Sequence, residues 1–356
     1  MQISLAQPTE LGPSEFSAWH SMQRMTGTLA NPFLCPEFSV AIGKFRSSAR
    51  VAVLAQGLEI IGFFPFERRR LGLGVPIGAG LNNCQGLIHV PAAEWDPREV
   101  LRASKVSVWQ FDKLAQGQRG FERYAAAKVP ASAVDLTSGF AVLREKLQAR
   151  SPEFYRKLDR TVRRLQREVG EIRYVADSRD PVAFRKFIGW KSDQCRRNRW
   201  VNAFDRPWVI DMVEYISCVR SDSFASMFSV LYAGETPIAG TFGLRSRDFF
   251  AGWFTGYDTR FGKYSPGFIQ LLHQAEELAA AGVRLIDLGT GGEGYKQRLR
   301  THELYVTKGM AARGPLTGGA HRIRSDCRTW AGSHAAKHPA VFRAADQLLR
   351  HCGQVN

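Results

Sequence analysis

The alternation of apolar and polar residues is clearest in the C-terminal half of the chain. Three apolar runs, at 225–233, 237–245 and 248–258, are separated only by the short turns GET and RSR. Runs of this length that are rich in Val, Phe and Tyr and joined by short turns predict an antiparallel meander. Upstream, helix-start residues and helical spacing predict three helices, at 151–170, 180–199 and 206–220.

A helix and a buried strand follow the meander. Ser265 and Pro266 supply an N-cap and a first-turn proline, and the apolar residues between Phe268 and Leu278 recur on one helical face. The run VRLIDLG (283–289) is apolar enough for the centre of a sheet. Because a helix separates the last two strands, they must lie parallel in an otherwise antiparallel sheet. The pattern therefore predicts an α/β fold of the α+β type.

The N-terminal half repeats part of this scheme. Residues 50–70 align with 227–247 after a one-residue slip, and the run VSVWQFDKL (106–114) takes the place of the late apolar strand. We interpret this repeat as an internal duplication, although two hairpins with the same turn chemistry by chance would look alike. The predicted division is into two domains and a basic helical tail, at 1–145, 146–315 and 316–356.

Composition restricts the class of protein. With 44% hydrophobic and 23% charged residues, the chain is typical of soluble globular proteins. It opens without a basic and apolar leader and has no run of the roughly eighteen apolar residues that a membrane span needs. The six cysteines lack metal-binding spacing, and His334 and His338 lack the glutamate of a zinc-protease helix. We expect a cytoplasmic protein with reduced thiols, no metal and no transmembrane segment.

Positive charge is the largest departure from an average composition. The formal net charge is +16, and residues 144–200 hold 17 Lys or Arg against 8 Asp or Glu. Such a surface attracts the phosphates of a nucleic acid, a phosphorylated cofactor or a membrane. A solvated basic helix explains the same residues equally well, so charge alone selects no partner.

The stretch IDLGTGGEGYK (286–296) resembles a nucleotide-binding loop, because its glycines satisfy the G-x-G-x-x-G spacing. The dinucleotide motif, however, belongs in the first turn of a parallel unit, whereas this strand follows a meander and a helix. A P-loop needs Ser or Thr after its lysine, and Gln297 stands there instead. We expect the glycines to let the chain leave a central strand through a tight loop. That loop would bring Tyr295 and Lys296 to the open end of the sheet.

The C-terminal sequence also resembles a known family. The run YSPGFIQLLHQAEELAAAGVRLIDLGTGGEGYKQRL (264–299) is similar to the signature of the CelD/BcsL-type acetyltransferases, and so are WKSDQCRRNR (190–199), NPFLCPEFSVAIGKF (31–45) and LNNCQGLI (81–88). The resemblance implies two tandem GNAT-like domains related to the Fem-type peptidyltransferases. Each would be a mixed, mostly antiparallel sheet flanked by helices. It also implies acetyl-CoA or another acyl-CoA as donor, and a role in exopolysaccharide or cellulose biosynthesis.

The resemblance implies roles for particular residues. Backbone N–H groups at a helix N-terminus favour anions, so the matched helix start supplies four candidates for binding the cofactor pyrophosphate: Tyr264, Ser265, Gly267 and Phe268. The usual Q/R-x-x-G-x-G/A loop is replaced by RFGKYSPG, whose proline has no N–H, and we expect Lys263 to compensate. The W-K-x-x-Q stretch and the Tyr-Lys pair supply the substrate-binding candidates: Trp190, Lys191, Gln194 and Lys296. An ordinary amphipathic helix with Trp190 in the core is the alternative.

Acyl transfer needs a nucleophile, stabilisation of an oxyanion and a proton for the leaving thiolate. Tyr295 is the candidate acid, although a tyrosine that packs on the glycine loop is an equally good interpretation. Asp287 lies in the apolar strand, where alternation points it away from the face of Ile286 and Leu288. A buried carboxylate is costly unless it is paired. Asp287 is therefore a base, a ligand holder or, by preference, half of a structural ion pair.

Three functions remain open. The first is GNAT-like transfer of an acyl group, acetyl by expectation, to an amine or hydroxyl of a saccharide or small precursor. The second is a Fem-like transferase that uses aminoacyl-tRNA, with 144–200 as the tRNA surface. The third is a non-catalytic scaffold that partners polysaccharide-synthesis proteins. The N-terminal copy lacks counterparts of YSPG and GEGYK, so we expect that domain to be degenerate.

Overall fold

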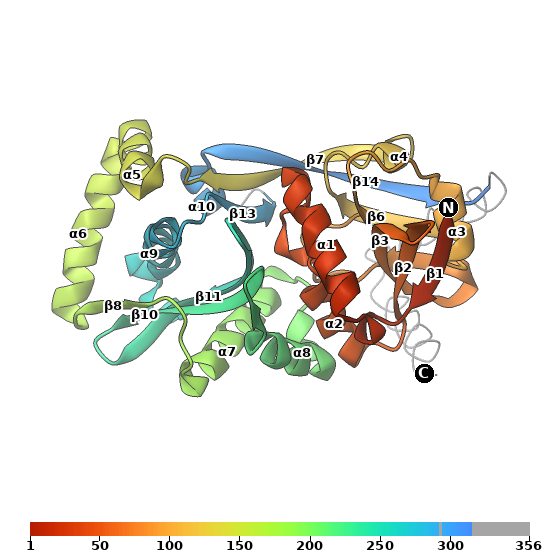
Figure 1. Cartoon of the computed structure of the whole chain (residues 1–356). Helices are drawn as coiled ribbons and strands as arrows, with labels where there is room; N and C mark the ends of the chain where they lie inside the picture. Colours follow the sequence, from red (N-terminus) through yellow and green to blue (C-terminus); the bar gives the residue numbers. More distant parts are fainter. Residues whose placement is uncertain (292–293, 315–356) are drawn as a thin grey trace, which may run out of the picture.

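The computed structural model describes residues 1–291 and 294–314 (Figure 1). They form a mixed sheet of 14 strands in the order β1-β2-β3-β4-β6-β14-β7-β13-β12-β11-β10-β8, with β5 beside β3 and β9 beside β10. The strands are β1 Gln2–Ala6, β2 Ala49–Gln56, β3 Glu59–Arg68, β4 Leu73–Pro76, β5 Ile88–His89, β6 Val108–Leu114, β7 Ala125–Asp135, β8 Ile172–Val175, β9 Arg220–Ser221, β10 Phe224–Ala233, β11 Thr236–Ser246, β12 Phe249–Tyr257, β13 Leu285–Thr290 and β14 His302–Ala312.

Helices flank this sheet, and α5 and α6 lie together at one end of the molecule (Figure 1). The three helices predicted upstream of the meander are confirmed as α6, α7 and α8. In the described ranges, no helix has the length and apolar character that crossing a membrane requires. The helices are α1 Pro13–Met25, α2 Pro36–Phe45, α3 Pro97–Ala103, α4 Arg119–Glu122, α5 Gly139–Arg150, α6 Pro152–Glu168, α7 Pro181–Asn198, α8 Pro207–Ser217, α9 Pro266–Ala280 and α10 Gly294–Leu299, and two of the 3-10 turns are η3 Pro32–Leu34 and η6 Thr259–Tyr264.

The C-terminal half, from α6 to β14, has the predicted meander. β10, β11 and β12 pair antiparallel in succession. α9 then crosses over, and β13 pairs parallel to β12, with Phe250 beside Ile286. This connection confirms the predicted parallel pair, because the strand pairs of the meander itself are antiparallel. α9 buries Phe268, Ile269 and Leu278 against it, as its apolar spacing predicts.

The N-terminal half, from β1 to β7, repeats the same order of strands. β2 and β3 form a hairpin that turns at Gly57 with φ 64°, as β10 and β11 turn at Gly234 with φ 55°. Both glycines adopt left-handed conformations that other residues rarely take. β6 pairs parallel to β4, as β13 pairs with β12. The predicted tandem fold is therefore confirmed.

The last strand of each half completes the sheet of the other half. β7 follows β6 along the chain but pairs with β13. β14 follows β13 but pairs with β6 and also with β7, and the two long strands run side by side in Figure 1. Sequence analysis did not anticipate β14.

The division at 145/146 remains a prediction, and the sheet is continuous across it. The predicted basic tail at 316–356 lies outside the described residues.

An aromatic cluster joins the halves on one side of the sheet. Trp253 of β12 packs edge to face against Phe33 and Phe38 of the N-terminal half, with ring centroids 5.3 and 5.7 Å away. Its indole Nε1 donates a hydrogen bond of 2.8 Å to the carbonyl of Leu81. Trp253 therefore connects β12 to the 81–88 segment.

We expect a Trp253→Phe variant to lose about 2 kcal/mol of unfolding free energy. The Leu81 carbonyl would lose its donor, and the smaller ring would leave space among the aromatic rings. Urea denaturation measures this loss. A Trp200→Phe variant is the control, because Trp200 is 47% exposed and its replacement should change stability by less than about 0.5 kcal/mol. Equal losses in both variants would contradict the role given to Trp253.

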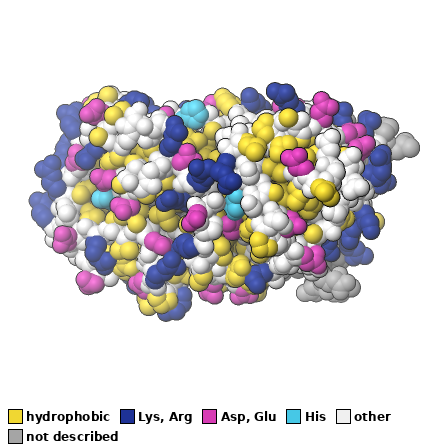
Figure 2. All heavy atoms as spheres, in the orientation of Figure 1, with side chains coloured by type: hydrophobic (Ala, Val, Ile, Leu, Met, Phe, Trp, Pro, Cys, Tyr) yellow, Lys and Arg dark blue, Asp and Glu magenta, His cyan; other side chains and the backbone are white. Residues whose placement is uncertain are grey.

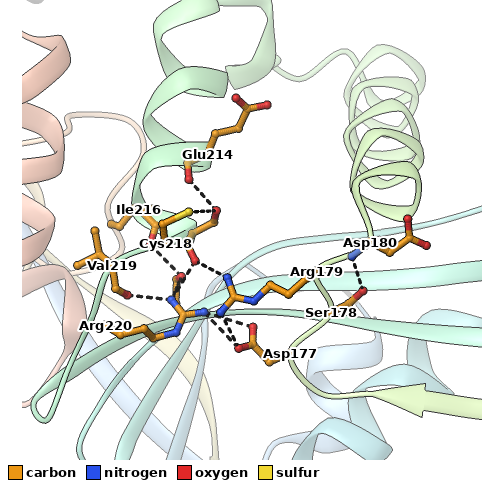
Figure 3. A network of polar contacts seen from close by, with 11 residues as sticks. Asp177, Ser178, Arg179, Asp180, Glu214, Ile216, Cys218, Val219 and Arg220 are labelled. Carbon is orange, nitrogen blue, oxygen red and sulfur yellow. Dashed lines mark hydrogen bonds and ion pairs between the residues drawn. The ribbon is translucent and has the colours of Figure 1, made fainter.

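A polar network joins α8 to the β8–α7 loop (Figure 3). Arg179 and Arg220 both reach the carboxylate of Asp177 and the carbonyl of Ser217, at 3.0 to 3.3 Å. Arg220 also donates to Ser226 of β10 at 2.8 Å. The arginines neutralise the carboxylate and satisfy carbonyls near the end of α8, so the network is explained as a structural contact.

Candidate active site

β12 and β13 lie parallel but separate early. Their pairing ends at Ala251 and Asp287, although β12 continues to Tyr257. Where they part, β12 has an extra residue opposite β11, at Trp253, and β13 turns at Gly289, with φ 78°. A bulge and a left-handed glycine both redirect a strand. The gap lies at the carboxyl ends of two parallel strands, where α/β proteins hold ligands.

A cavity of about 760 Å³ opens beside the end of β12 at this place, and its lining residues include none from β13. Its walls come from α6, α7, β11, β12, η6, α9 and α10, all in the C-terminal half. A volume of several hundred Å³ suits a cofactor-sized ligand. Among the residues predicted from the sequence, the following line it: Gln194, Ser265, Gly267, Phe268 and Tyr295.

The first turn of α9 forms one wall of the cavity. Ser265 is left-handed, with φ 56°, its N–H bonds to Gly262, and the Phe268 N–H returns to Ser265. Pro266 has no N–H. Within the described ranges, the backbone offers no acceptor to the Gly267 N–H. The anion-binding potential of this helix start therefore rests on Gly267 and on the dipole of α9.

Lys263 and Tyr264 contact α6 and are not among the residues that line the cavity. The Tyr264 hydroxyl donates to Glu168 Oε2, and Lys263 Nζ lies 3.2 Å from the same oxygen. The bond from Tyr264, followed by that from Arg164, lowers the pKa of Glu168 to about 2. The left-handed turn at Ser265 separates these two residues from the start of α9. Their predicted cofactor role remains a prediction.

Arg298 is a cation at the cavity that the sequence reasoning missed. It lies on α10, and its guanidinium carbon is 4.2 Å from the centroid of the Phe154 ring. Phe154 packs edge to face on Phe268 of α9, at 5.0 Å. The signal in the sequence was the spacing from Tyr295, since residues three apart share a helix face. Arginine suits planar anions and phosphates. Arg298 is therefore a further candidate for binding the phosphates of an acyl donor.

A smaller chamber of about 130 Å³ adjoins the cavity. The two share Thr241, Thr255, Leu271 and Tyr295 in their walls. Tyr295 therefore lies at the junction, where a group carried by a ligand in the large cavity would meet a molecule in the chamber.

The chamber brings together predicted residues of α7 and α10 with one residue of the N-terminal half. Lys191 Nζ donates to Gln194 at 2.9 Å, and Lys296, which is 7% exposed, donates to the Thr290 carbonyl at 3.0 Å. Asn83, which the sequence reasoning did not name individually, donates to the Gly252 carbonyl at 3.1 Å. Two ammonium groups and an amide suit a polar acceptor. Trp190 packs against the core and lines neither space.

Asp287 is buried beneath the glycine turn. Its Oδ1 accepts the Gly289 N–H at 2.7 Å, and its Oδ2 accepts from Asn31 of the N-terminal half at 3.2 Å. Burial raises the pKa of this carboxyl to about 6, against the effect of these two hydrogen bonds and of Lys296 and Lys113. Asp287 lines neither space. Among the described residues, hydrogen bonds hold the Asp287 carboxylate, and not the ion pair that we preferred from the sequence.

The sequence pattern of the acetyltransferase (GNAT) domain matches residues 152–297. The C-terminal half carries a GNAT domain. This match covers both parting strands, α9 and the Tyr295–Lys296 pair, and it supports an acyltransferase. None of the curated proteins matches the chain in sequence.

The GNAT domain lies in a tandem fold that solved structures share. FemX is 9% identical, with a TM-score of 0.54 over 87% of this chain and 96% of its own. The C-terminal domain attributed to a lysylphosphatidylglycerol synthetase of Agrobacterium fabrum is 10% identical, with a TM-score of 0.51 over 87% and 96%. A Bacteroides thetaiotaomicron protein of unknown function is 10% identical, with a TM-score of 0.52 over 86% and 100%. These likenesses concern the fold, and the narrower CelD/BcsL resemblance remains a prediction.

Proposed function

We propose that the chain transfers an acyl group from an acyl-CoA to an amine or hydroxyl. Acetyl-CoA is the first donor to test. The observation that carries the proposal is the junction at Tyr295 between the large cavity and the inner chamber. The donor would lie in the large cavity beside β12, with its phosphates toward the first turn of α9 and Arg298. The acceptor would lie in the chamber beside Lys191 and Lys296.

In the proposed reaction, the acceptor nitrogen or oxygen attacks the thioester carbonyl carbon. The tetrahedral intermediate collapses, the carbon–sulfur bond breaks, and the Tyr295 hydroxyl gives its proton to the departing thiolate. The acceptor loses one proton to water, and water restores the proton of Tyr295. Asp287 would act through the backbone of Gly289, because it holds the turn that leads to Tyr295.

The acceptor class follows the resemblance noted in the sequence. We propose a saccharide or small precursor, and a place in exopolysaccharide or cellulose biosynthesis. The polar chamber supports this choice, because sugar hydroxyls and amides suit the donors of Lys191, Lys296 and Asn83. A scaffold role without catalysis is the outcome if variants of Tyr295 leave every activity unchanged.

A second candidate is supported by the basic surface of α6. Six basic residues of this helix are exposed, and Figure 2 shows Lys and Arg side chains gathered at that end of the molecule. With the Fem-type fold, this surface would suit the phosphates of an aminoacyl-tRNA donor. The residues are Arg156, Lys157, Arg160, Arg163, Arg164 and Arg167.

Isothermal titration of the full chain tests the two donors. We expect saturable binding of an acyl-CoA that survives added salt, and weak, salt-sensitive binding of bulk tRNA. The titrants are acetyl-CoA, longer acyl-CoAs, free CoA and bulk tRNA. Binding of tRNA alone would favour the second candidate, and a chain that binds no thioester would contradict the proposed function.

We expect a Gly267→Glu variant to weaken acyl-CoA binding at least tenfold, about 1.4 kcal/mol. A carboxylate in the first turn of α9 would repel the phosphates, although it would not disturb the helix, which favours acids there. Gly267→Ala is the matched control, because its Cβ would meet only Tyr257, at 3.4 Å. The Kd from titration is the readout. Unchanged affinity in the glutamate variant would remove the donor phosphates from this helix start.

A further inference from the structure

Three metal-ligating side chains meet at a place that the acyl-transfer site does not use. His20 lies on α1, Cys35 is the N-cap of α2, and Glu37 lies in its first turn. One ligand atom of each lies within 4.8 Å of the others. His20 Nε2 is 3.1 Å from Glu37 Oε1. Cys35 is 1% exposed and Glu37 7%, so water screens the cluster poorly.

The cluster is incompletely satisfied by the surrounding protein. Glu37 Oε1 accepts from Ser221 at 2.7 Å. Its other oxygen, Glu37 Oε2, is buried without a partner in the described part of the chain, and so is Gln23 Oε1. Buried polar atoms without partners are rare, and each one needs an explanation such as a missing ion. Both orphaned atoms are oxygens that a cation accepts as ligands.

The chemistry of the cluster selects the kind of cation. Magnesium and calcium take oxygen ligands only, whereas a thiolate, an imidazole and a carboxylate together suit zinc. Bonds of about 2.0–2.3 Å in a tetrahedral site place the ligand atoms about 3.3–3.8 Å apart. The observed cluster needs only a small contraction to reach this size.

We propose that His20, Cys35 and Glu37 bind a structural zinc ion, with Gln23 or water in the fourth position. Sequence analysis expected no metal, because the six cysteines lack metal-binding spacing. The proposal is independent of the acyl-transfer function. It requires the Cys35 proton to leave when the ion binds.

A neighbouring cleft gives an ion access to the cluster, and the contacts of Glu37 indicate which parts of the fold the ion would hold together. A cleft of about 430 Å³, lined by residues of both halves, includes His20 and Gln23 in its walls. Ser221, which bonds to Glu37, belongs to β9 of the C-terminal half. The ion would join α1 to α2 and, through Glu37, hold the N-terminal half against the C-terminal half.

Cobalt substitution tests the proposal directly. The full chain is stripped with a chelator, and Co²⁺ or Zn²⁺ is added. We expect one ion per chain by elemental analysis, a thiolate-to-cobalt charge-transfer band, and a Tm that rises with zinc. In Cys35→Ser the band should disappear, whereas Cys218→Ser, which alters an exposed cysteine, should retain it. Comparing these variants is decisive, because the sequence after 314 contains further Cys and His.

A second variant guards against simple loss of folding. Glu37→Gln keeps an oxygen for Ser221 but removes the carboxylate, and we expect its zinc Kd to rise at least tenfold while the metal-free Tm stays close to wild type. Fewer than about 0.1 ions per wild-type chain under saturating zinc would overturn the proposal. A charge-transfer band that persists in Cys35→Ser would overturn it as well, since the ion would then be bound elsewhere.

Discussion

Replacing Tyr295 with phenylalanine is expected to lower kcat about 100-fold, the usual contribution of a general acid. The ring would still separate the cavity from the chamber, so the KM for the donor and the Tm should change little. The proton for the departing thiolate would have to come from water. Steady-state kinetics with the donor found by titration, followed by release of free CoA, measures the effect.

A second tyrosine of the same cavity provides the matched control. Tyr257 lines the cavity at the end of β12 and is 37% exposed. Tyr257→Phe removes a hydroxyl from the same wall, and we expect kcat within about threefold of wild type because this residue is outside the chamber. If both variants lose the same activity, or if Tyr295→Phe loses less than threefold, Tyr295 is a structural residue of the glycine loop.

Asp287 should make the stability of the chain depend on pH in an unusual direction. Its pKa is raised from 3.8 to about 6 by burial, so the folded state binds the proton more tightly than the unfolded state. Stability from this group is fully present below about pH 4 and is lost as pH rises through about 6. The shift corresponds to about 3 kcal/mol. Groups whose pKa is lowered, such as Glu168, act in the opposite sense.

An Asp287→Asn variant isolates this contribution. The amide does not titrate, so we expect wild type to lose about 2 kcal/mol relative to the variant between pH 4 and 7. Urea midpoints across this range measure the difference. Asp222→Asn, at an exposed turn, should track wild type throughout. A difference between wild type and Asp287→Asn that is constant with pH would show that the carboxyl does not gain a proton in this range.

The periodic elements were predictable because each depends on its own residues. The meander, α9 and β13 follow from apolar spacing, turn glycines and a first-turn proline. β14 was missed because it alternates poorly and is mostly half-buried. It becomes a strand only by pairing with β6 on one side and β7 on the other. Tertiary context overrides weak local preference in such strands.

The site was predictable in part for the same reason. Tyr295, Lys296 and the start of α9 lie close in sequence to the parting strands, so their motif places them. Asn31 reaches Asp287 across 256 positions, and no local pattern predicts such a contact. Lys263 precedes the helix start in sequence, but the left-handed conformation of Ser265 changes the direction of the chain between them.

The exchanged strands have a consequence for how the chain is made. Val129 of β7 pairs with Val306 of β14, so the N-terminal half leaves the ribosome with β6 and β7 still lacking partners that are synthesised much later. Open strand edges bind other chains readily, and pairings so distant in sequence form slowly. The chain is therefore most prone to aggregation during its synthesis, before its last described strand emerges from the ribosome. During that interval, the nascent chain would depend on chaperones.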